Sequence, residues 1–247
     1  MSTFKNKLAI VTGGNSGIGY AAAKELVAKE ATVIITGRRK EAVEKAAKEI
    51  GAIPFVADQA SLKDIDALYE EVGKKHGKVD ILFINAGIVG NMGPIESKTE
   101  DDFDSVMNIN FKGAYFTLSR FIPLLNDGAS VVILSSIVAA TYKPNSSVYQ
   151  ASKAALNSIA KTAAAELAPR KIRVNIVSPG PTKTEVMTKM GLDDVALQQI
   201  QEHLVNAIPL KKMGTAEDVA KLVVYLSDEA ATFVTGSEIV VDGGLTL

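Results

Sequence analysis

The chain alternates short apolar runs with longer stretches of helical periodicity. Apolar residues, most of them consecutive, dominate seven runs at 8–12, 31–36, 53–57, 79–84, 130–135, 173–178 and 238–241. Such runs are typical of strands buried on both faces of a sheet. Helical spacing fills about 18–29, 40–50, 61–76, 99–125 and 149–168, and resumes at 215. This alternation predicts an α/β fold, a single domain with a doubly wound parallel sheet of about seven strands and helices on both faces.

Local signals mark several helix ends. Ser61 is a good N-cap for the helix to about 76, and the acidic residues that follow Thr99 suit the start of a long helix toward 125. The segment from 183 to 212 is less regular. We predict a mobile substrate lid over about 184–213, with a fixed helical insertion as the alternative. The flexible and hinge residues of this lid would be Met187, Met190, Gly191, Met213 and Gly214.

Composition excludes several classes of function. The 247 residues carry a formal net charge of −1, which gives no electrostatic reason for binding nucleic acid or an anionic membrane. There is no cysteine, so disulfides and thiolate catalysis are excluded, and the two histidines, His76 and His203, argue against a metal site. No signal sequence is evident, and no apolar run approaches the roughly 18 residues of a membrane span. We therefore expect a cytoplasmic protein.

A glycine-rich loop follows the first predicted strand. Gly13, Gly17 and Gly19 lie between that strand and the first helix, with the spacing G-x-x-x-G-x-G. Strand, glycine loop and helix together present backbone N–H groups and a helix N-terminus to a phosphate. A glycine-rich turn with no ligand is the plainer alternative. The context of strand and helix favours phosphate binding.

The second predicted strand ends in a basic sequence. Many dinucleotide sites place an acidic residue about 20 positions after the glycines, where it binds the ribose 2′-hydroxyl. Here that place holds Gly37, followed by Arg38, Arg39 and Lys40. The guanidinium of arginine suits phosphate oxygens, so Arg38 favours a 2′-phosphate and therefore NADP(H) over NAD(H). Lys40 is expected only to open a solvated helix.

A tyrosine and a lysine four residues apart are the candidate proton-transfer groups. Tyr149 and Lys153 would share one helix face, and an ammonium beside a phenol should lower the tyrosine pKa from about 10 toward neutrality. A tyrosine tuned in this way can exchange a proton with an alcohol oxygen. Ser136 lies thirteen residues before Tyr149 and could orient that oxygen. The pair alone is a weak signal, because Tyr20 and Lys24 have the same spacing.

Taken together, the motifs resemble those of the short-chain dehydrogenase/reductase family over nearly the whole chain. They stand in the family's order: Thr12-Gly13-x-x-x-Gly17-Ile18-Gly19, Asn85-Ala86-Gly87, Asn110, Ser136, Tyr149-x-x-x-Lys153 and Pro179-Gly180-x-x-x-Thr184. The resemblance implies a Rossmann-type fold and a catalytic set of Asn110, Ser136, Tyr149 and Lys153. With the basic residues above, the predicted cofactor contacts are Gly13, Asn15, Ser16, Gly17, Ile18, Gly19, Arg38, Arg39, Asp58, Gln59, Asn85, Ala86, Gly87, Tyr149, Lys153, Pro179, Gly180, Thr182 and Thr184.

The implied reaction is hydride transfer between a nicotinamide and a carbonyl carbon. Ser136 and Tyr149 would hydrogen-bond the carbonyl oxygen, and Tyr149 would supply its proton. Lys153 would bind the nicotinamide ribose, and Asn110 would hold a water that links the lysine to solvent. Two residues depart from the family's pattern. Thr182 stands where isoleucine is common, and Gln59 stands in the adenine pocket where a small apolar residue is common.

The substrate is less well determined by the sequence. Segments 88–94, 138–142 and 186–192 should line its pocket, and their apolar character favours a neutral ketone or alcohol. A thioester on an acyl carrier protein stays open. A non-enzymatic dinucleotide sensor or scaffold is the alternative from another class, although such a protein should lose one of the four catalytic residues. A serine hydrolase is weaker, because the chain has no G-x-S-x-G motif.

Self-association is expected from the helix that carries Tyr149. This helix has more small side chains than contact with one sheet face requires: Ala151, Ala154, Ala155, Ser158, Ala163 and Ala165. Small side chains allow another helix to approach closely, and a helix from a second copy under two-fold symmetry is the expected partner. The resemblance implies a homotetramer.

Overall fold

Seven parallel strands form the central sheet, in the order β3-β2-β1-β4-β5-β6-β9. The computed structural model describes residues 3–183 and 194–247. The strands are β1 (Leu8–Val11), β2 (Thr32–Gly37), β3 (Ile53–Val56), β4 (Val79–Ile84), β5 (Leu125–Leu134), β6 (Arg173–Pro179) and β9 (Glu238–Val241). A separate parallel pair joins β7 (Thr182–Lys183) to β8 (Gly214–Thr215). The strand order reverses between β1 and β4, which defines a crevice at their carboxyl ends.

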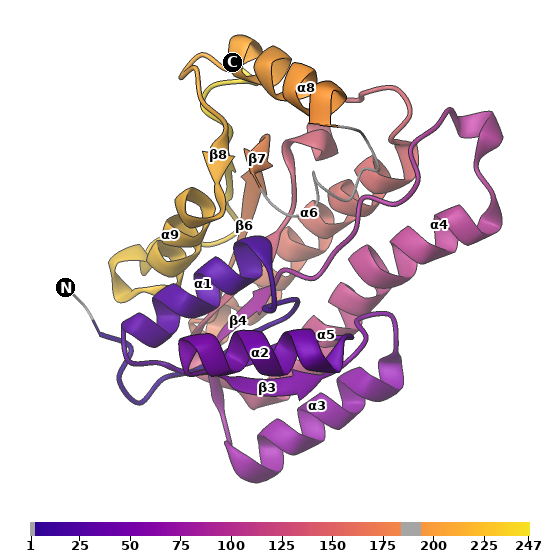
Figure 1. Ribbon diagram of the computed structural model, residues 1–247. Helices are drawn as coiled ribbons and strands as arrows, with labels where there is room; N and C mark the ends of the chain where they lie inside the picture. The colour runs from indigo at the N-terminus through magenta and orange to yellow at the C-terminus, as the bar shows by residue number, and fades with distance from the viewer. Residues whose placement is uncertain (1–2, 184–193) are drawn as a thin grey trace.

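Helices cover both faces of this sheet (Figure 1). They are α1 (Gly17–Ala28), α2 (Lys40–Ile50), α3 (Leu62–Lys75), α4 (Glu100–Met107), α5 (Ala114–Phe121), α6 (Ser147–Leu167), α8 (Asp194–Ala207) and α9 (Ala216–Ser227). One core cluster joins the sheet to α1, α2 and α9, and the other joins it to α3, α5 and α6. Neighbouring strand residues belong to opposite clusters, as with Ala9 and Ile10, because successive side chains point to opposite faces. The predicted doubly wound fold is confirmed.

Three predicted elements have the expected bounds, namely α2, β4 and β9. Ser61 caps α3 through a hydrogen bond that its hydroxyl accepts from the Asp64 N–H. Thr99 forms a capping box with Asp102 at the start of α4. The Thr99 hydroxyl accepts from the Asp102 N–H, and the Asp102 carboxylate accepts from the Thr99 N–H.

The predicted helix over 99–125 is wrong as a single element. It is divided into α4 and α5 by a π-helical turn, Asn108–Gly113, and the chain enters β5 at Leu125. The pairing of β4 with β5 shifts register between Val79 and Ile81, which accommodates the early start of β5. The irregular segment predicted over 183–212 contains the helix α8, which lies apart from the two helix layers at the top of Figure 1.

Most of the predicted lid, including Met187, Met190 and Gly191, lies outside the described residues. Two residues named for this lid, Met213 and Gly214, are described, and the lid itself stays a prediction. Met213 is buried, and the Gly214 N–H donates to the Pro181 carbonyl at 3.1 Å where β8 pairs with β7. Among the residues described, no helix has the length and apolarity needed to cross a membrane.

Candidate active site

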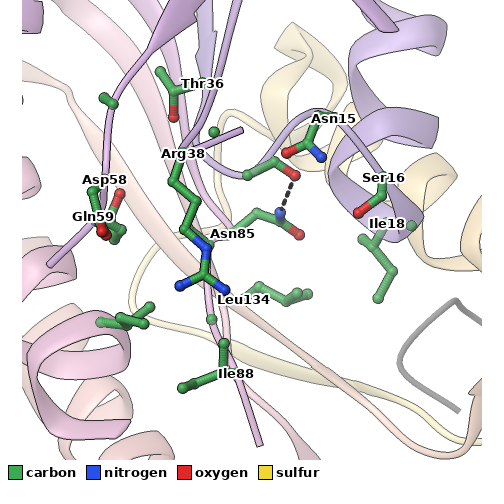
Figure 2. A pocket seen from close by; sticks show the side chains of 17 residues that line it. Asn15, Ser16, Ile18, Thr36, Arg38, Asp58, Gln59, Asn85, Ile88 and Leu134 are labelled. Carbon is green, nitrogen blue, oxygen red and sulfur yellow. Dashed lines mark hydrogen bonds between the residues drawn. The ribbon is translucent and has the colours of Figure 1, made fainter. Parts of the chain in front are cut away.

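A cavity of about 270 Å³ lies at the carboxyl ends of the first four strands (Figure 2). Each strand contributes the residues that directly follow it or end it, including Gly13 after β1, Arg38 after β2, Asp58 after β3 and Asn85 after β4. The predicted residues that line the cavity are Gly13, Asn15, Ser16, Gly17, Ile18, Arg38, Asp58, Gln59, Asn85, Ala86 and Gly87. The reversal of strand order therefore brings most of the predicted cofactor residues together.

The glycine loop is held tightly at two positions. Gly13 has a φ of +64°, a left-handed conformation that favours glycine. A Cβ on Gly19 would lie 2.4 Å from the Gly13 carbonyl oxygen and 2.5 Å from Nδ2 of Asn85. Gly19 therefore does not line the cavity but permits the close approach of α1 to the loop.

Asn85 and Thr12 fasten this loop across the crevice. The Thr12 hydroxyl accepts hydrogen bonds from the backbone N–H groups of Asn85 (2.9 Å) and Ala86 (3.1 Å). In return, Nδ2 of Asn85 donates to the carbonyls of Thr12 (2.9 Å) and Gly13 (3.2 Å). Figure 2 shows the Asn85 amide directed at the glycine loop. The Asn85-Ala86-Gly87 motif thus sets the shape of the cavity floor.

The first turn of α1 faces the same cavity. Ser16 is its N-cap, yet the Ser16 side chain makes no capping hydrogen bond, and the first turn contains no acidic residue. The first N–H groups of a helix have no partner within the helix. Because no capping side chain in the described part of the chain satisfies them, the Gly17 and Ile18 N–H groups and the positive end of the helix dipole face the cavity.

The basic residues after β2 have different surroundings. Arg38 is exposed and extends into the cavity, as Figure 2 shows, with no ion pair among the residues that the structure describes. Arg39 is the exposed N-cap of α2 and is not part of the cavity wall. Lys40 lies 3.9 Å from a Glu44 carboxylate oxygen on its own helix, as expected for a solvated helix face. Of these three cations, Arg38 is the one that lines the cavity.

Asp58 and Gln59 form the wall after β3. The Asp58 carboxylate accepts from the Ala60 N–H at 2.9 Å, which shapes the turn. The Gln59 amide turns away from the cavity, and its Nε2 donates to the Thr117 hydroxyl on α5 at 2.9 Å. Gln59 therefore links this wall of the cavity to α5, which lies behind the wall.

A second cavity, of about 240 Å³, contains the candidate catalytic residues Ser136, Tyr149 and Lys153. Its wall shares five residues with the first cavity, so the two form one continuous cleft: Ile18, Asn85, Gly87, Ile88 and Leu134. Pro179 and Gly180 at the end of β6, and Thr182 at the start of β7, complete the second wall. The Gly180 N–H donates to the Val241 carbonyl at 2.9 Å, which ties this wall to β9. Thr184 lies outside the described residues.

Lys153 is buried, with 3% of its surface exposed. Its Nζ donates to the Leu134 carbonyl at 2.8 Å and lies 5.9 Å from the centroid of the Tyr149 ring. Burial lowers the pKa of Lys153 from 10.5 to about 8, because a charged ammonium is costly away from water.

The prediction that Lys153 lowers the tyrosine pKa is wrong. Burial raises the pKa of Tyr149 above 10, and a hydrogen bond with the Ser136 side chain opposes only part of this effect. The physical reason is that a phenolate in this cavity loses its hydration, while the lysine directs an N–H at Leu134 instead. Tyr149 therefore retains its proton at neutral pH.

Asn110 is fully buried within the π-helical turn. Its Oδ1 accepts from the Ile88 N–H at 2.8 Å, and its Nδ2 donates to the Ile88 carbonyl at 2.8 Å and to the Ser152 hydroxyl at 3.0 Å. A Cβ on Gly87 would lie 3.2 Å from Oδ1 of Asn110 and 3.5 Å from Nζ of Lys153, so both side chains flank that glycine. Asn110 thus fixes the loop after β4, and its role in holding a water stays a prediction.

The segments expected to line the substrate pocket are divided between two places. Ile88 and Val89 line the catalytic cavity. Pro94, Ala139 and Tyr142 instead line a separate hollow of about 570 Å³ on another side of α6. The difference arises because Gly93 and Asn145 join the two loops through a backbone hydrogen bond of 2.8 Å. Residues 186–192 lie outside the described part of the chain.

Several residues of the cleft are not among the predicted site residues. Cavity walls include Thr36, Ala57, Ile109, Leu134 and Ser135, and Thr12 and Ser152 support the site from behind. Thr12, Thr36 and Ser135 share one signal, a hydroxyl residue at the carboxyl end of an apolar run. Tyr20, by contrast, bonds Glu49 on the neighbouring helix at 3.2 Å, as expected of a residue outside the site.

Replacing Lys153 by methionine should change how stability depends on pH. Below pH 8 the folded chain holds a charged amine in a buried place, at a cost that the unfolded chain does not bear. Between about pH 8 and 10.5 the folded lysine is neutral while the unfolded lysine is still charged, so this cost disappears as pH rises. We expect the free energy of unfolding of the wild type to rise relative to Lys153→Met across that window, measured by urea denaturation. Lys161→Met, on the exposed face of α6, is the control, and an equally flat difference for both variants would contradict the prediction.

Comparison with known proteins agrees with the fold. Residues 13–246 match the sequence profile of a family described as Enoyl-(Acyl carrier protein) reductase. Oxidoreductase asL5 of Sarocladium schorii is 36% identical over 97% of this chain and 95% of its own. Human Dehydrogenase/reductase SDR family member 4 is 34% identical over 97% of this chain and 87% of its own.

A solved structure shows the same likeness in three dimensions. The 3-ketoacyl-(acyl-carrier-protein) reductase of Brucella melitensis, complexed with NADH, superposes with a TM-score of 0.91 at 30% identity, over 99% of this chain and 100% of that chain. Sequence profile, relatives and solved structure agree on the family and the fold. The chain belongs to the short-chain dehydrogenase/reductase family of oxidoreductases.

Proposed function

We propose that the chain is an NADP(H)-dependent ketone reductase or alcohol dehydrogenase in which Tyr149 is the general acid and base. One observation carries the proposal. The cavity that contains Ser136, Tyr149 and Lys153 is continuous with the cavity under the glycine loop, through shared wall residues such as Asn85 and Leu134. A dinucleotide in one part of the cleft would thus meet proton-transfer groups in the other. We expect the enzyme to work in the cytoplasm.

The residues present fit a dinucleotide. The N–H groups at the start of α1 lack a capping side chain, and the close contact of Gly19 with the loop lets that helix end face the cleft. Arg38 extends into the cavity, and Lys153 lies at its catalytic end. The Gly17 and Ile18 amides would hold the diphosphate, Arg38 a 2′-phosphate, and Lys153 a ribose hydroxyl.

A bound nicotinamide would supply or accept a hydride at the substrate carbon. Tyr149 keeps its proton at neutral pH, because burial raises its pKa, and can give that proton to a carbonyl oxygen. The Ser136 hydroxyl bonds Tyr149 and accepts from the Val138 N–H at 3.3 Å, which holds it at the same point of the cavity. These two hydroxyls would bind and orient the substrate oxygen.

The walls support a neutral substrate. Beside the catalytic hydroxyls lie Ile88, Val89 and Leu134, and Lys153 is the charged side chain among the described residues of this cavity. A neutral ketone or secondary alcohol suits such a wall. Thioesters stay a test case, because relatives by name act on acyl-carrier-protein substrates.

A panel of ketones, alcohols and thioesters with each nicotinamide, followed by absorbance of the reduced ring, tests the proposal. Absence of turnover with every pair would favour the sensor or scaffold.

Tyr149→Phe keeps the ring but removes the proton. We expect kcat to fall by about 10² to 10⁴, the scale of general acid–base groups, while cofactor affinity changes little. Steady-state kinetics and cofactor titration measure the two effects separately. Tyr142→Phe is the matched control, because Tyr142 is 83% exposed and lines the separate hollow. Near-normal turnover in Tyr149→Phe would mean that the proton comes from another group.

Arg38→Ala should remove most of a preference for NADPH over NADH. A charge-assisted bond to the 2′-phosphate corresponds to a preference of about tenfold or more, at the low end because Arg38 is exposed and screened by salt. The comparison is kcat/KM for the two reduced cofactors. Arg39→Ala removes the same charge one residue away, outside the cavity wall, and should keep most of the preference. A wild-type preference for NADH would overturn the assignment.

Self-association into a homotetramer is part of the proposal. Ala151, Ala154, Ser158 and Ala165 leave small side chains exposed along α6, while Ala163 faces the core. Phe103 and Tyr115, on the two helices that pack on the same side of the sheet, are 48% and 45% exposed. We expect light scattering at micromolar concentration to give four times the mass of the chain, and Ala154→Arg to reduce that mass. A wild-type monomer would contradict the proposal.

A further inference from the structure

Gln59 makes a contact that a residue of a cofactor pocket does not need. It lines the cavity beside Asp58, but its amide Nε2 donates to the hydroxyl of Thr117 on α5 at 2.9 Å. Thr117 is 1% exposed and lines no part of the cleft in the described chain. The side chain of a cavity residue thus hydrogen-bonds a buried hydroxyl that is not part of the cavity wall.

Thr117 in turn contacts the π-helical turn. Its hydroxyl donates to the carbonyl of Gly113, the last residue of the turn, at 2.8 Å. The backbones meet at the same point, because a Cβ on Gly113 would lie 2.0 Å from the Gln59 carbonyl oxygen. Gln59 is therefore linked to the C-terminal end of the π turn through Thr117, and its main chain packs closely against Gly113.

The other end of the contact series reaches the catalytic tyrosine. Within the turn, Asn110 donates to the Ser152 hydroxyl at 3.0 Å, and Ser152 donates to the Tyr149 carbonyl at 2.7 Å. Gln59, Thr117, the π turn, Asn110, Ser152 and Tyr149 form one unbroken series of contacts. It runs behind the cleft, from the end near Arg38 and Asp58 to the end near Lys153.

A π turn needs such clamps because it holds one residue more than an α-helix of the same rise. If it relaxed to α-helical bonding, residues on one side would rotate by about 100° relative to those on the other. That rotation would take Asn110 away from Ile88 and Ser152. Asn110 fixes the turn from within, and Thr117 with Gln59 fixes its end.

We propose that Gln59 and Thr117 are positioning residues that hold the π turn in register and, through Asn110 and Ser152, set the position of Tyr149. The proposal rests on the proposed function for its kinetic consequences, whereas its structural part concerns the ligand-free chain. Loss of the Gln59–Thr117 bond should then impair turnover more than cofactor binding.

Thr117→Val is the decisive variant, because valine has the same shape and lacks the hydroxyl. We expect kcat to fall about three- to tenfold, the effect of one lost hydrogen bond, while cofactor KM stays within about twofold. Thr117→Ser should restore kcat, since it restores the hydroxyl. Ser227→Ala is the matched control. Ser227 is buried on α9, and its hydroxyl makes the same kind of bond to a carbonyl four residues earlier, at 2.8 Å from Val223.

A double-mutant cycle tests whether the two residues act as a pair. Gln59→Met removes the amide and keeps the length of the side chain. If the bond between Gln59 and Thr117 carries the effect, the double variant should be no slower than the slower single variant. Multiplied losses in the double variant would overturn the pairing.

Amide hydrogen exchange of the ligand-free chain separates this proposal from the proposed function. Thr117→Val should speed exchange in peptides that cover 108–113 and the start of α6, and Ser227→Ala should not. Unchanged exchange in those peptides, or equal losses of kcat in Thr117→Val and Ser227→Ala, would overturn the proposal. If the wild type turns over no substrate, the proposed function fails, while exchange still decides the positioning role.

Discussion

The pairing of β1 with β4 is the constraint on which the rest of the structure depends. Residues 9–11 of β1 pair with 33–35 of β2 on one side and with 81–83 of β4 on the other. The chain leaves β1 toward α1 on one face and reaches β4 from α3 on the opposite face. Because the two connections diverge, no crossover helix covers the carboxyl ends of these strands. The crevice that results is where the glycine loop, Asn85 and the candidate catalytic residues meet.

Beyond the strand ends at such a crevice, backbone N–H and C=O groups no longer pair with a neighbouring strand. Side-chain amides supply the missing hydrogen-bond partners. Asn85 bonds the carbonyls of Thr12 and Gly13 on one side of the crevice. Asn110 bonds both backbone groups of Ile88 on the other. A buried backbone group without a partner is costly, so each amide holds its loop in one arrangement. The geometry of the cleft thus follows from satisfying hydrogen bonds.

The fold was predictable wherever hydrophobic periodicity and local caps agree. Residues 40–50, 79–84 and 238–241 have strong patterns and clear boundaries, and their bounds are confirmed. The π turn over 108–113 was not predictable, because one added residue shifts the apolar pattern too little to show within a long helix. The start of β5 at Leu125 depends on a register shift against β4, which is a tertiary effect.

The site divides in the same way. The motif residues, being spaced along single elements or at strand ends, could be placed from the sequence. Arg38 and Arg39 could not be distinguished, because only the turn into α2 decides which of them reaches the cavity. The direction of the Tyr149 pKa shift also depends on burial, which raises this pKa and is not visible in spacing.

Burial also changes the order in which the catalytic pair loses protons. It raises the pKa of Tyr149 and lowers that of Lys153 to about 8, so the first proton to leave the pair as pH rises comes from the lysine. An ammonium has three donors, and the bond described for Nζ, to the Leu134 carbonyl, uses one of them. A ligand that offers an oxygen to the other donors favours the charged lysine and raises its pKa again. Ligand binding and protonation of Lys153 are therefore linked, and the ammonium that would stabilise a phenolate at Tyr149 is favoured once the cleft is filled.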